Sequence, residues 1–321
     1  MDFKSIVAVV ADDFAAVDTF IADSLRSRVP LVNEVGQYIV QSGGKRLRPL
    51  VCLLAARACG YQGADHHVRV AGMIELLHTA TLLHDDVVDE SGLRRGRATA
   101  NARWDNPTAV LVGDYLISQA FHLVVSLGNL SVMDIMSKGT CIIAEGEVLQ
   151  LINQRDPATT EARYMEVIYG KTAKLFECAA EAGAALGNPD LRATLAAYAR
   201  HLGAAFQIID DVLDYTSSAD VMGKNVGDDL AEGKPTLPLI QAMKLLPDAD
   251  AQLIREAIRT GGLEHLDRIV TLVRDCGALD YTMARAREES ELALSALKDV
   301  PASPWRQALE DLTRLALARN S

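Results

Sequence analysis

Two clusters of aspartate residues are the part of this sequence whose residue types and spacing most directly suggest chemistry. The first spans residues 78–89 and the second spans residues 206–214, and together they contain Asp85, Asp86, Asp89, Asp210, Asp211 and Asp214. On a helix that turns 100° per residue, Asp85 and Asp89 lie about 40° apart on one face. Gln207, Asp210 and Asp214 share a face by the same spacing.

A single cluster of this kind is most often a solvated helix face, but two copies with similar apolar flanks indicate a joint role. Carboxylates that face each other repel strongly without a counter-charge, and a bound cation supplies one. The ligands are hard oxygens with no cysteine beside them. This favours magnesium, which binds through few carboxylates and bridges to phosphate oxygens. The two clusters therefore predict a magnesium site for a phosphorylated ligand.

Basic residues gather where such a ligand would need them. The segment Gly43-Gly44-Lys45-Arg46-Leu47-Arg48-Pro49 places three cations around a flexible turn at an expected helix N-terminus, where exposed amides and the helix dipole also favour an anion. Further basic residues follow the first cluster and stand near the second: Arg94, Arg95, Lys171, Lys224 and Lys234. Each alone is equally well explained as a surface residue. Together they predict two anion sites, one with metal and one held by Lys and Arg alone.

The elements that position these residues are predicted to be helices throughout, in a single all-α domain over residues 1–321, a bundle around a central active-site cavity. Apolar residues recur at helical spacing and no convincing alternating strand is present. Pro49 suits the first turn of a helix that runs toward Cys59. Two polar segments, 91–103 and 217–235, directly follow the acidic clusters, where the rim of an active site is expected.

Composition narrows the classes of function. The chain has 321 residues and a net charge of −11, which argues against nonspecific nucleic-acid binding, since that requires a broad basic face. Five widely spaced cysteines without a C-x-x-C pair indicate reduced, buried thiols rather than disulfides or zinc ligands. The apolar run at residues 6–10 ends at acidic residues, so no signal peptide is expected.

One uncharged stretch, Tyr115 to Met133, is about long enough to cross a bilayer. It contains seven polar, histidine or glycine positions. A buried helix, a turn and the start of a second helix explain it better. A cytoplasmic, soluble protein is the expectation.

The ordered motifs resemble those of the trans-isoprenyl diphosphate synthases, the polyprenyl synthetase family. Gly-Gly-Lys-Arg-Leu-Arg-Pro, the first Asp-Asp-x-x-Asp with Arg94-Arg95, Gly170-Lys-Thr, the second Phe-Gln-x-x-Asp-Asp-x-x-Asp and Gly227-Asp-Asp-Leu with Glu-Gly-Lys-Pro follow the family's order. They cover residues from about 30 to 240. Within the family, the run 78–91 is most similar to bacterial octaprenyl diphosphate synthases.

The resemblance implies a prenyltransferase that joins isopentenyl diphosphate units to an allylic primer such as farnesyl diphosphate, with three magnesium ions around the bound diphosphate. It implies catalytic roles for Asp85, Asp89, Asp210 and Lys171, the three aspartates as metal ligands, with Asp86, Asp211 and Asp214 as supporting acids. The allylic diphosphate would be held by Arg94, Lys171, Thr172, Gln207, Lys224 and Lys234. Isopentenyl diphosphate would be held by Lys45, Arg48, His78 and Arg95. The departing diphosphate would take the proton, so no side-chain base is expected.

Product length is expected to depend on the space below the first cluster. Ala80 and Thr81 lie about one turn before Asp85, where short-chain members of the family often carry bulky residues. Both are small here, which favours a long chain of octaprenyl length, although both residues would also suit ordinary helix packing. Met133 and Met136 are one turn apart and are predicted as a deeper floor, with plain core packing as the alternative.

Three other classes of function fit the sequence less well. His66-His67 with His84-Asp85 could indicate a metal phosphohydrolase, but that class leaves the second cluster and the basic turn without roles. A class I terpene cyclase would not need the basic site at Lys45 and Arg48. A non-catalytic subunit would be expected to have lost acidic residues that are intact here. Geranylgeranyl, heptaprenyl, solanesyl and decaprenyl products stay open.

The resemblance also implies partners. The family usually forms homodimers through helix packing, which the long apolar helices permit. The product would be the precursor of a quinone side chain such as that of ubiquinone. The enzyme would therefore contact the membrane transiently when it releases the product, and no nucleic-acid partner is expected.

Overall fold

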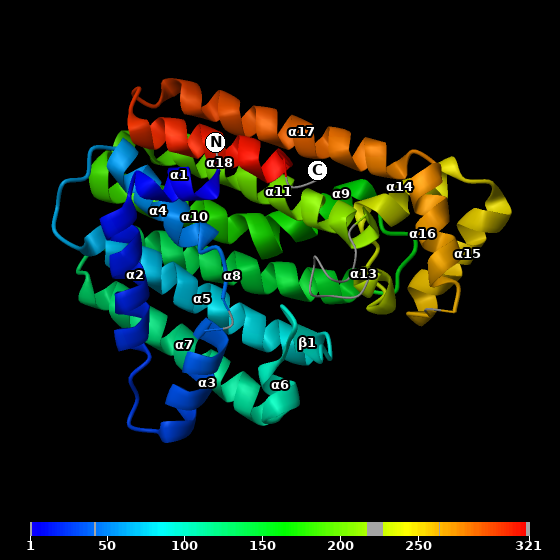
Figure 1. The fold of residues 1–321 in the computed structure, drawn as a ribbon, viewed down its shortest axis with the longest axis horizontal. Helices are drawn as coiled ribbons and strands as arrows, with labels where there is room; N and C mark the ends of the chain where they lie inside the picture. The colour runs from blue at the N-terminus through cyan, green and yellow to red at the C-terminus, as the bar shows by residue number, and fades with distance from the viewer. Residues whose placement is uncertain (1, 42, 217–226, 263, 319–321) are drawn as a thin grey trace. The chain divides into compact units, whose positions relative to one another are not determined.

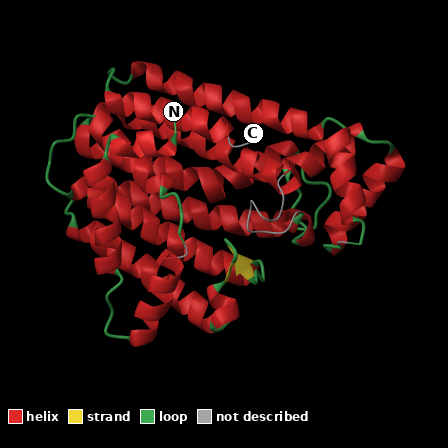
Figure 2. Ribbon diagram, in the orientation of Figure 1, coloured by secondary structure: helices red, strands yellow, loops and turns green. Residues whose placement is uncertain are grey.

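The computed structural model describes residues 2–41, 43–216, 227–262 and 264–318 (Figure 1). These residues are almost entirely helical, as the periodicity predicts (Figure 2). Among them, the strands are limited to β1 (Leu93–Arg94) and β2 (Arg97–Ala98), which pair antiparallel in the polar segment after the first aspartate cluster. The all-α class is therefore confirmed, and the small hairpin is a feature that the sequence pattern did not predict.

Contacts divide the chain into two compact units. Unit 1 comprises Met1–Gly139, Leu175–Ala199 and Ala296–Leu312, and unit 2 comprises Thr140–Lys174, Arg200–Ser295 and Thr313–Ser321. A single domain over residues 1–321 stays a prediction.

Unit 1 is built around one central helix, α5 (His66–Val88). Buried positions lie on every side of this helix, which packs against α2 (Ala11–Ser24), α4 (Leu47–Ala58) and α7 (Asn106–Ser126), as expected for a helix at the centre of a core (Figure 1). The unit also contains α1 (Phe3–Ala8), α3 (Pro30–Gln41), α6 (Ala100–Arg103), η2 (Pro189–Leu191), η3 (Leu297–Asp299) and parts of α8 (Leu130–Asn153), α10 (Lys174–Gly187), α11 (Arg192–Thr216) and α18 (Pro304–Leu317). The first aspartate cluster is thus carried at the end of the central helix of unit 1.

The helix α2 is tied to α4 and α5 by a partly buried charge cluster. Arg57 donates from Nε and Nη2 to the two carboxylate oxygens of Asp13, both at 2.7 Å, and His67 Nε2 lies 2.9 Å from the same carboxylate. Burial opposes the charge of Asp13, but these partners outweigh it and hold the pKa of Asp13 below its ordinary value. The helix α2 is therefore part of the unit 1 core.

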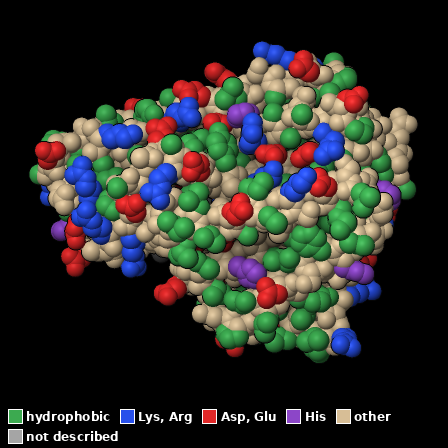
Figure 3. Space-filling view, turned by 180° about the vertical axis from the view of Figure 1, so that it is seen from behind, with side chains coloured by type: hydrophobic (Ala, Val, Ile, Leu, Met, Phe, Trp, Pro, Cys, Tyr) green, Lys and Arg blue, Asp and Glu red, His purple; other side chains and the backbone are tan. Residues whose placement is uncertain are grey.

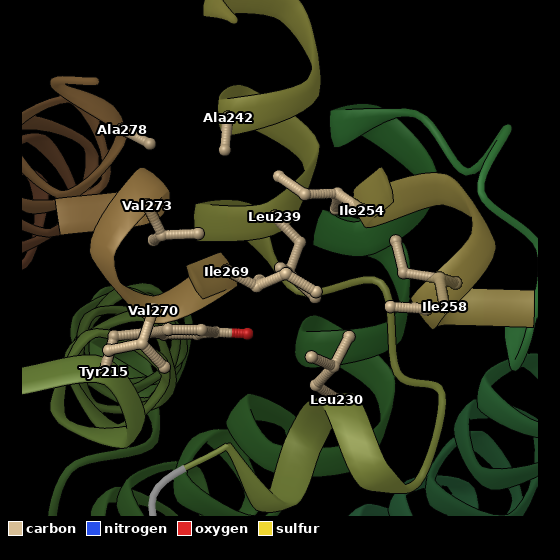
Figure 4. Packing of buried hydrophobic residues seen from close by; sticks show 11 residues of the cluster. Tyr215, Leu230, Leu239, Ala242, Ile254, Ile258, Ile269, Val270, Val273 and Ala278 are labelled. Atoms are coloured by element: carbon tan, nitrogen blue, oxygen red, sulfur yellow. The ribbon is translucent and has the colours of Figure 1, made fainter. Parts of the chain in front are cut away.

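Unit 2 contains a core formed by the ends of several short helices. Tyr215 of α11, Leu230 of α13 (Asp228–Ala231) and Leu239 of α14 (Leu237–Leu245) meet side chains of α15 (Asp248–Thr260) and α16 (Leu266–Asp275) (Figure 4). A second cluster joins α9 (Glu161–Ile168), α11 and α14 with Ala286 of α17 (Ala278–Ala296). The second aspartate cluster lies on α11 between these two cores.

All five cysteines lie in the described part of the chain, and none forms a disulfide. Cys52, Cys59 and Cys178 are buried as predicted, whereas Cys276 is half-buried and Cys141 is exposed. The prediction of uniformly buried thiols is therefore wrong for these two. Burial raises the pKa of the Cys59 thiol to about 11, so this thiol stays protonated.

The uncharged stretch Tyr115–Met133 is confirmed as a helix, a turn and the start of a second helix, because α7 ends at Ser126 and α8 begins at Leu130. By length and composition α7 could cross a membrane, and it is the one such helix in the described ranges. A core helix of a soluble protein passes the same test. About a third of its most apolar window is buried, so much of its apolar surface faces outward.

Candidate active site

The carboxylates of the first cluster lie at the C-terminal end of α5. Asp85 and Asp86 occupy its last turn, and Asp89 is the C-cap residue. Carboxylates are disfavoured at this end of a helix, because the carbonyl ends of the helix dipole are negative. The placement therefore demands positive charge nearby, either from side chains or from a cation.

Asp86 receives that charge from Arg94. The guanidinium Nε and Nη2 of Arg94 lie 2.8 and 2.7 Å from Oδ1 of Asp86, whose side chain is wholly buried. Burial raises the pKa of Asp86, and Asp85 and Asp89 add to the rise, although Arg94 opposes it. Asp86 is thus buried and paired with Arg94, and its supporting role stays a prediction.

The basic turn before α4 brings several cations around His78. Arg48 Nη1 lies 3.1 Å from Nε2 of His78, and its guanidinium carbon lies 4.5 Å above the ring of Phe176. Arg46, in a left-handed conformation with φ of 49°, pairs with buried Glu75 and donates to the carbonyl of Val40. Arg48 and His78 are therefore brought together as predicted, whereas Arg46 anchors the turn.

Arg95 lies beside the same turn. A Cβ atom on Gly44 would lie 2.9 Å from Nη1 of Arg95, so a residue with a side chain at position 44 would displace this guanidinium. Lys45 is exposed in the turn. The predicted isopentenyl diphosphate residues thus all belong to unit 1, and three of them form a compact basic group.

His78 is neutral in this environment. Burial lowers the pKa of His78 well below its ordinary value, and Arg48, Arg95, Arg94 and Arg46 lower it further. A neutral ring can accept the N–H of Arg48 at Nε2, which an imidazolium could not do. His78 therefore orients a cation.

In unit 2 the second cluster is organised around Asp211. Tyr164 donates its hydroxyl to Oδ2 of Asp211 at 2.6 Å, and Gln207 donates from Nε2 to Oδ1 at 2.8 Å. Burial raises the pKa of Asp211 well above its ordinary range, and the nearby Asp229 adds to this effect. Asp211 is thus buried and hydrogen-bonded within the protein, while Asp210, at the preceding position of α11, is half-buried. The supporting role of Asp211 stays a prediction.

The Gly-Lys-Thr motif forms a π-helical turn, η1 (Tyr169–Ala173), between α9 and α10. Lys171 Nζ donates to Glu147 at 2.6 Å, and Thr172 donates to Oε1 of Gln207 at 2.9 Å. The second bond joins two residues that the sequence predicted for the same ligand. Single π turns inside helices are frequent at functional sites.

Lys224 and Lys234 are the last two cations predicted to hold the allylic diphosphate. Lys234 follows Gly233, which has φ of +70°, and forms an ion pair with Glu232. Lys224 lies outside the described residues. Arg94, Lys171 and Lys234 therefore share one property, since each is paired with a carboxylate of the protein.

The residues predicted to control product length lie in unit 1. Ala80 is fully buried, and Thr81 is half-buried and donates to the carbonyl of His78 at 2.8 Å. Met136 is buried, whereas Met133 is 38% exposed. Of the two methionines, only Met136 is enclosed, as a residue at the floor of a product pocket would be.

The donor set of the first cluster fits a hard cation. Oδ2 of buried Asp86 accepts no hydrogen bond within the described ranges, and two further carboxylates stand on the same helix end. Over residues 2–41, 43–216, 227–262 and 264–318, no three His, Cys, Asp or Glu side chains converge as a preformed cage. Magnesium is typically held by one or two carboxylates plus substrate phosphates, so an open arrangement of this kind suits it.

The structure is incompatible with a histidine-aspartate phosphohydrolase. His67 is buried against Asp13, while His84 lies 3.1 Å from the carbonyl of Val110. The two histidines are separated by seventeen positions on α5, or about 25 Å at 1.5 Å per residue. They cannot share a metal ion.

Comparison with known proteins identifies the family of this chain. The chain belongs to the polyprenyl synthetase family, whose model matches residues 29–274. It is 57% identical to the all-trans-nonaprenyl-diphosphate synthase (geranyl-diphosphate specific) of Rhodobacter capsulatus, over 99% of each chain. It is 50% identical to the octaprenyl diphosphate synthase of Escherichia coli, over the whole of both chains.

Among solved structures, the polyprenyl synthase of Caulobacter crescentus, complexed with calcium and isoprenyl diphosphate, superposes with a TM-score of 0.96. It is 40% identical, and the match covers 100% of this chain and 98% of that one. The protein is a prenyltransferase of the all-α isoprenoid synthase fold.

Proposed function

We propose that the protein is a long-chain trans-polyprenyl diphosphate synthase whose main product is octaprenyl diphosphate, made from farnesyl diphosphate and isopentenyl diphosphate. The observation that carries this proposal is the pair of aspartate clusters, each at the end of an otherwise apolar helix, together with the neutral His78 among arginines. The E. coli relative supports the octaprenyl product. The R. capsulatus relative makes a nonaprenyl product the main alternative.

Asp85, Asp89 and Asp210 are proposed as magnesium ligands, and Lys171, Thr172, Gln207, Arg94, Lys224 and Lys234 as the groups that hold the allylic diphosphate. When bound, magnesium would neutralise the diphosphate and make it a better leaving group. We propose three ions with the bound diphosphate. Lys45, Arg48, His78 and Arg95 would hold isopentenyl diphosphate without metal.

The side chains then perform binding and charge stabilisation. As the C–O bond of the primer breaks, its electron pair leaves with the diphosphate, whose growing charge Lys171 and Lys234 stabilise. The double bond of isopentenyl diphosphate attacks the allylic cation, and the released diphosphate takes the proton that is lost. Glu147 and Glu232 neutralise Lys171 and Lys234 before substrate binds, and the diphosphate would take over that role.

The product would leave toward a membrane as the precursor of a quinone side chain such as that of ubiquinone, and the enzyme would act in the cytoplasm.

We also propose a homodimer. Large apolar side chains are exposed along α7 and α8, notably Leu111 at 66%, Val125 at 58% and Leu130 at 81%. Several large apolar side chains exposed on neighbouring helices favour an interface with another copy of the chain. On the face in Figure 3, hydrophobic side chains are gathered beside interspersed acidic and basic ones.

Product analysis tests the proposal. Purified protein would be incubated with magnesium, labelled isopentenyl diphosphate and either farnesyl or geranyl diphosphate, and the dephosphorylated products sized by mass spectrometry. A dominant octaprenol from farnesyl diphosphate is expected. A dominant nonaprenol would replace the proposed chain length but keep the reaction, and no elongation by folded protein would overturn the catalytic assignment.

A further inference from the structure

The π-helical turn η1 determines which way Lys171 and Thr172 point. A π turn contains one residue more than an α turn, so the side chains after it are rotated by about 100° relative to an unbroken helix. A π turn is rare compared with an α-helical turn, so contacts with the surrounding protein must stabilise it. The contacts of η1 within unit 2 therefore bear directly on the proposed diphosphate site.

Backbone packing supplies one of these contacts. A Cβ atom on Gly146 of α8 would lie 2.6 Å from the backbone nitrogen of Lys171, so the two backbones approach more closely than any side chain would permit. Gly170 meets Gly146 from the other side, with its Cβ position 3.0 Å from the Gly146 Cα. This packing fixes the distance of the turn from α8, but it does not fix its rotation.

Rotation is fixed by hydrogen bonds at both ends of the turn. At its far end, Thr172 donates to Gln207 of α11. At its near end, the hydroxyl of Tyr169 donates to Oε1 of Glu289 on α17 at 2.8 Å. Lys171, which stands between these bonds, is thereby held with its stem in one orientation.

Glu289 is a buried charge that the aspartate and lysine motifs do not use. Its exposed fraction is 2%, and its second oxygen lies 2.7 Å from Nδ1 of His201. Arg285, one turn away on α17, approaches to 3.7 Å. Burial alone would oppose the charge, but His201 and Tyr169 outweigh it and hold the pKa of Glu289 below its ordinary value. The carboxylate is thus a fixed acceptor for Tyr169.

We propose that Glu289 and Tyr169 are positioning residues of the reaction, which hold the π turn so that Lys171 and Thr172 meet the diphosphate of the primer. This inference rests on the proposed role of Lys171 and Thr172. Its distinguishing consequence is selectivity. Loss of the Tyr169–Glu289 bond weakens binding of the primer, while isopentenyl diphosphate, assigned to residues of unit 1, is bound as before.

Tyr169→Phe tests this, since it removes a single hydroxyl. The KM for farnesyl diphosphate is expected to rise about tenfold, the effect of one lost hydrogen bond, with the KM for isopentenyl diphosphate changed less than about twofold. Glu289→Gln, which keeps an acceptor for Tyr169, is expected to raise the primer KM less than Glu289→Leu, which does not. A Glu289→Leu protein that fails to fold leaves the Tyr169→Phe result to decide.

Tyr198→Phe is a matched control. Tyr198 is also a buried tyrosine, and it donates to the carbonyl of Leu309 at 2.8 Å in unit 1. It should lower thermal stability without changing the ratio of the two KM values. If Tyr169→Phe behaves like this control, the positioning role is overturned.

Lys171→Ala separates this inference from the proposed function. A selective rise of the primer KM in Lys171→Ala without one in Tyr169→Phe overturns the positioning role alone. An unchanged primer KM in Lys171→Ala overturns the assigned role of Lys171 and this inference with it. If both variants raise the primer KM, Tyr169→Phe is expected to add much less in the Lys171→Ala background than it does alone.

Discussion

Arg94 and Asp86 form an ion pair in which the guanidinium touches one oxygen of a wholly buried carboxylate at 2.7 and 2.8 Å. The pair joins the middle residue of the first aspartate cluster to the β1 strand that follows it. Asp86 therefore holds the loop that carries Arg94 and Arg95, while Asp85 and Asp89 stay half-exposed at the helix end.

Arg94→Ala is expected to destabilise the fold by about 3 kcal/mol, because it leaves a buried carboxylate without its partner. Urea unfolding measures this loss. Arg26→Ala is the control, since Arg26 pairs with Asp23 at an exposed site and should cost less than about 1 kcal/mol. Equal, small losses in the two variants would contradict a structural role for the Arg94–Asp86 pair.

Asp85→Asn is expected to lower kcat by about 100-fold, because it removes the negative charge of one carboxylate from the proposed metal site and leaves the helix folded. Chelation by EDTA should abolish elongation, and added magnesium should restore it. Asp134→Asn removes an exposed carboxylate of α8 and should leave kcat unchanged. Elongation that continues in EDTA would be incompatible with the metal assignment.

Ala80→Tyr is expected to shorten the product, because a phenol at this fully buried position would fill space that the growing chain needs. Mass spectrometry of the dephosphorylated products checks this. Ala80→Ser keeps a small side chain and should leave the product distribution as it is. An unchanged length in Ala80→Tyr, with elongation retained, would refute the role of this position in chain length.

Stability is expected to fall as pH drops below about 6.5, in part because of His78. The pKa of His78 is lowered in the fold, so the unfolded chain takes up a proton that the folded protein does not. The stability from this group is complete above the unfolded pKa of about 6.5, and it declines by at most about 1.4 kcal/mol per pH unit below it.

Urea unfolding of the wild type and of His78→Gln at pH 7.5 and 5.5 measures that contribution. The glutamine keeps an acceptor for Arg48 but does not titrate. The variant should therefore lose less stability between the two pH values than the wild type does. Identical losses would show that the fold does not lower the pKa of His78.

Much of the architecture was predictable because the hydrophobic pattern is strong. The apolar run before Asp85 predicts a helix with carboxylates at its end, and Pro49 lies in the first turn of α4 as expected. The supporting roles of Asp86 and Asp211 are implied by the resemblance to the family, not by the local sequence. In the structure, each of these carboxylates accepts a hydrogen bond from a side chain of the protein, Asp86 from Arg94 and Asp211 from Tyr164.

The rest depends on contacts that local sequence does not encode. Nothing in Gly170-Lys-Thr distinguishes a π turn from an α turn. The π turn contains one extra residue, and contacts with Gly146 and Glu289 stabilise it. Glu147 and Tyr164 were not singled out, since each acts through a partner distant in sequence. Gly146 and Gly170, one in each of two predicted helices, are a sequence signal that could have indicated a close contact between those helices.

The tie between Asp13, Arg57 and His67 also determines where the folding unit begins. The match to the family model starts at residue 29, yet Ile6, Val17 and Ile21 are buried before that point and Asp13 accepts two hydrogen bonds from Arg57. A fragment that started at residue 29 would leave the guanidinium of Arg57 and the buried ring of His67 without a carboxylate. The shortest fragment that preserves this packing therefore includes α1 and α2.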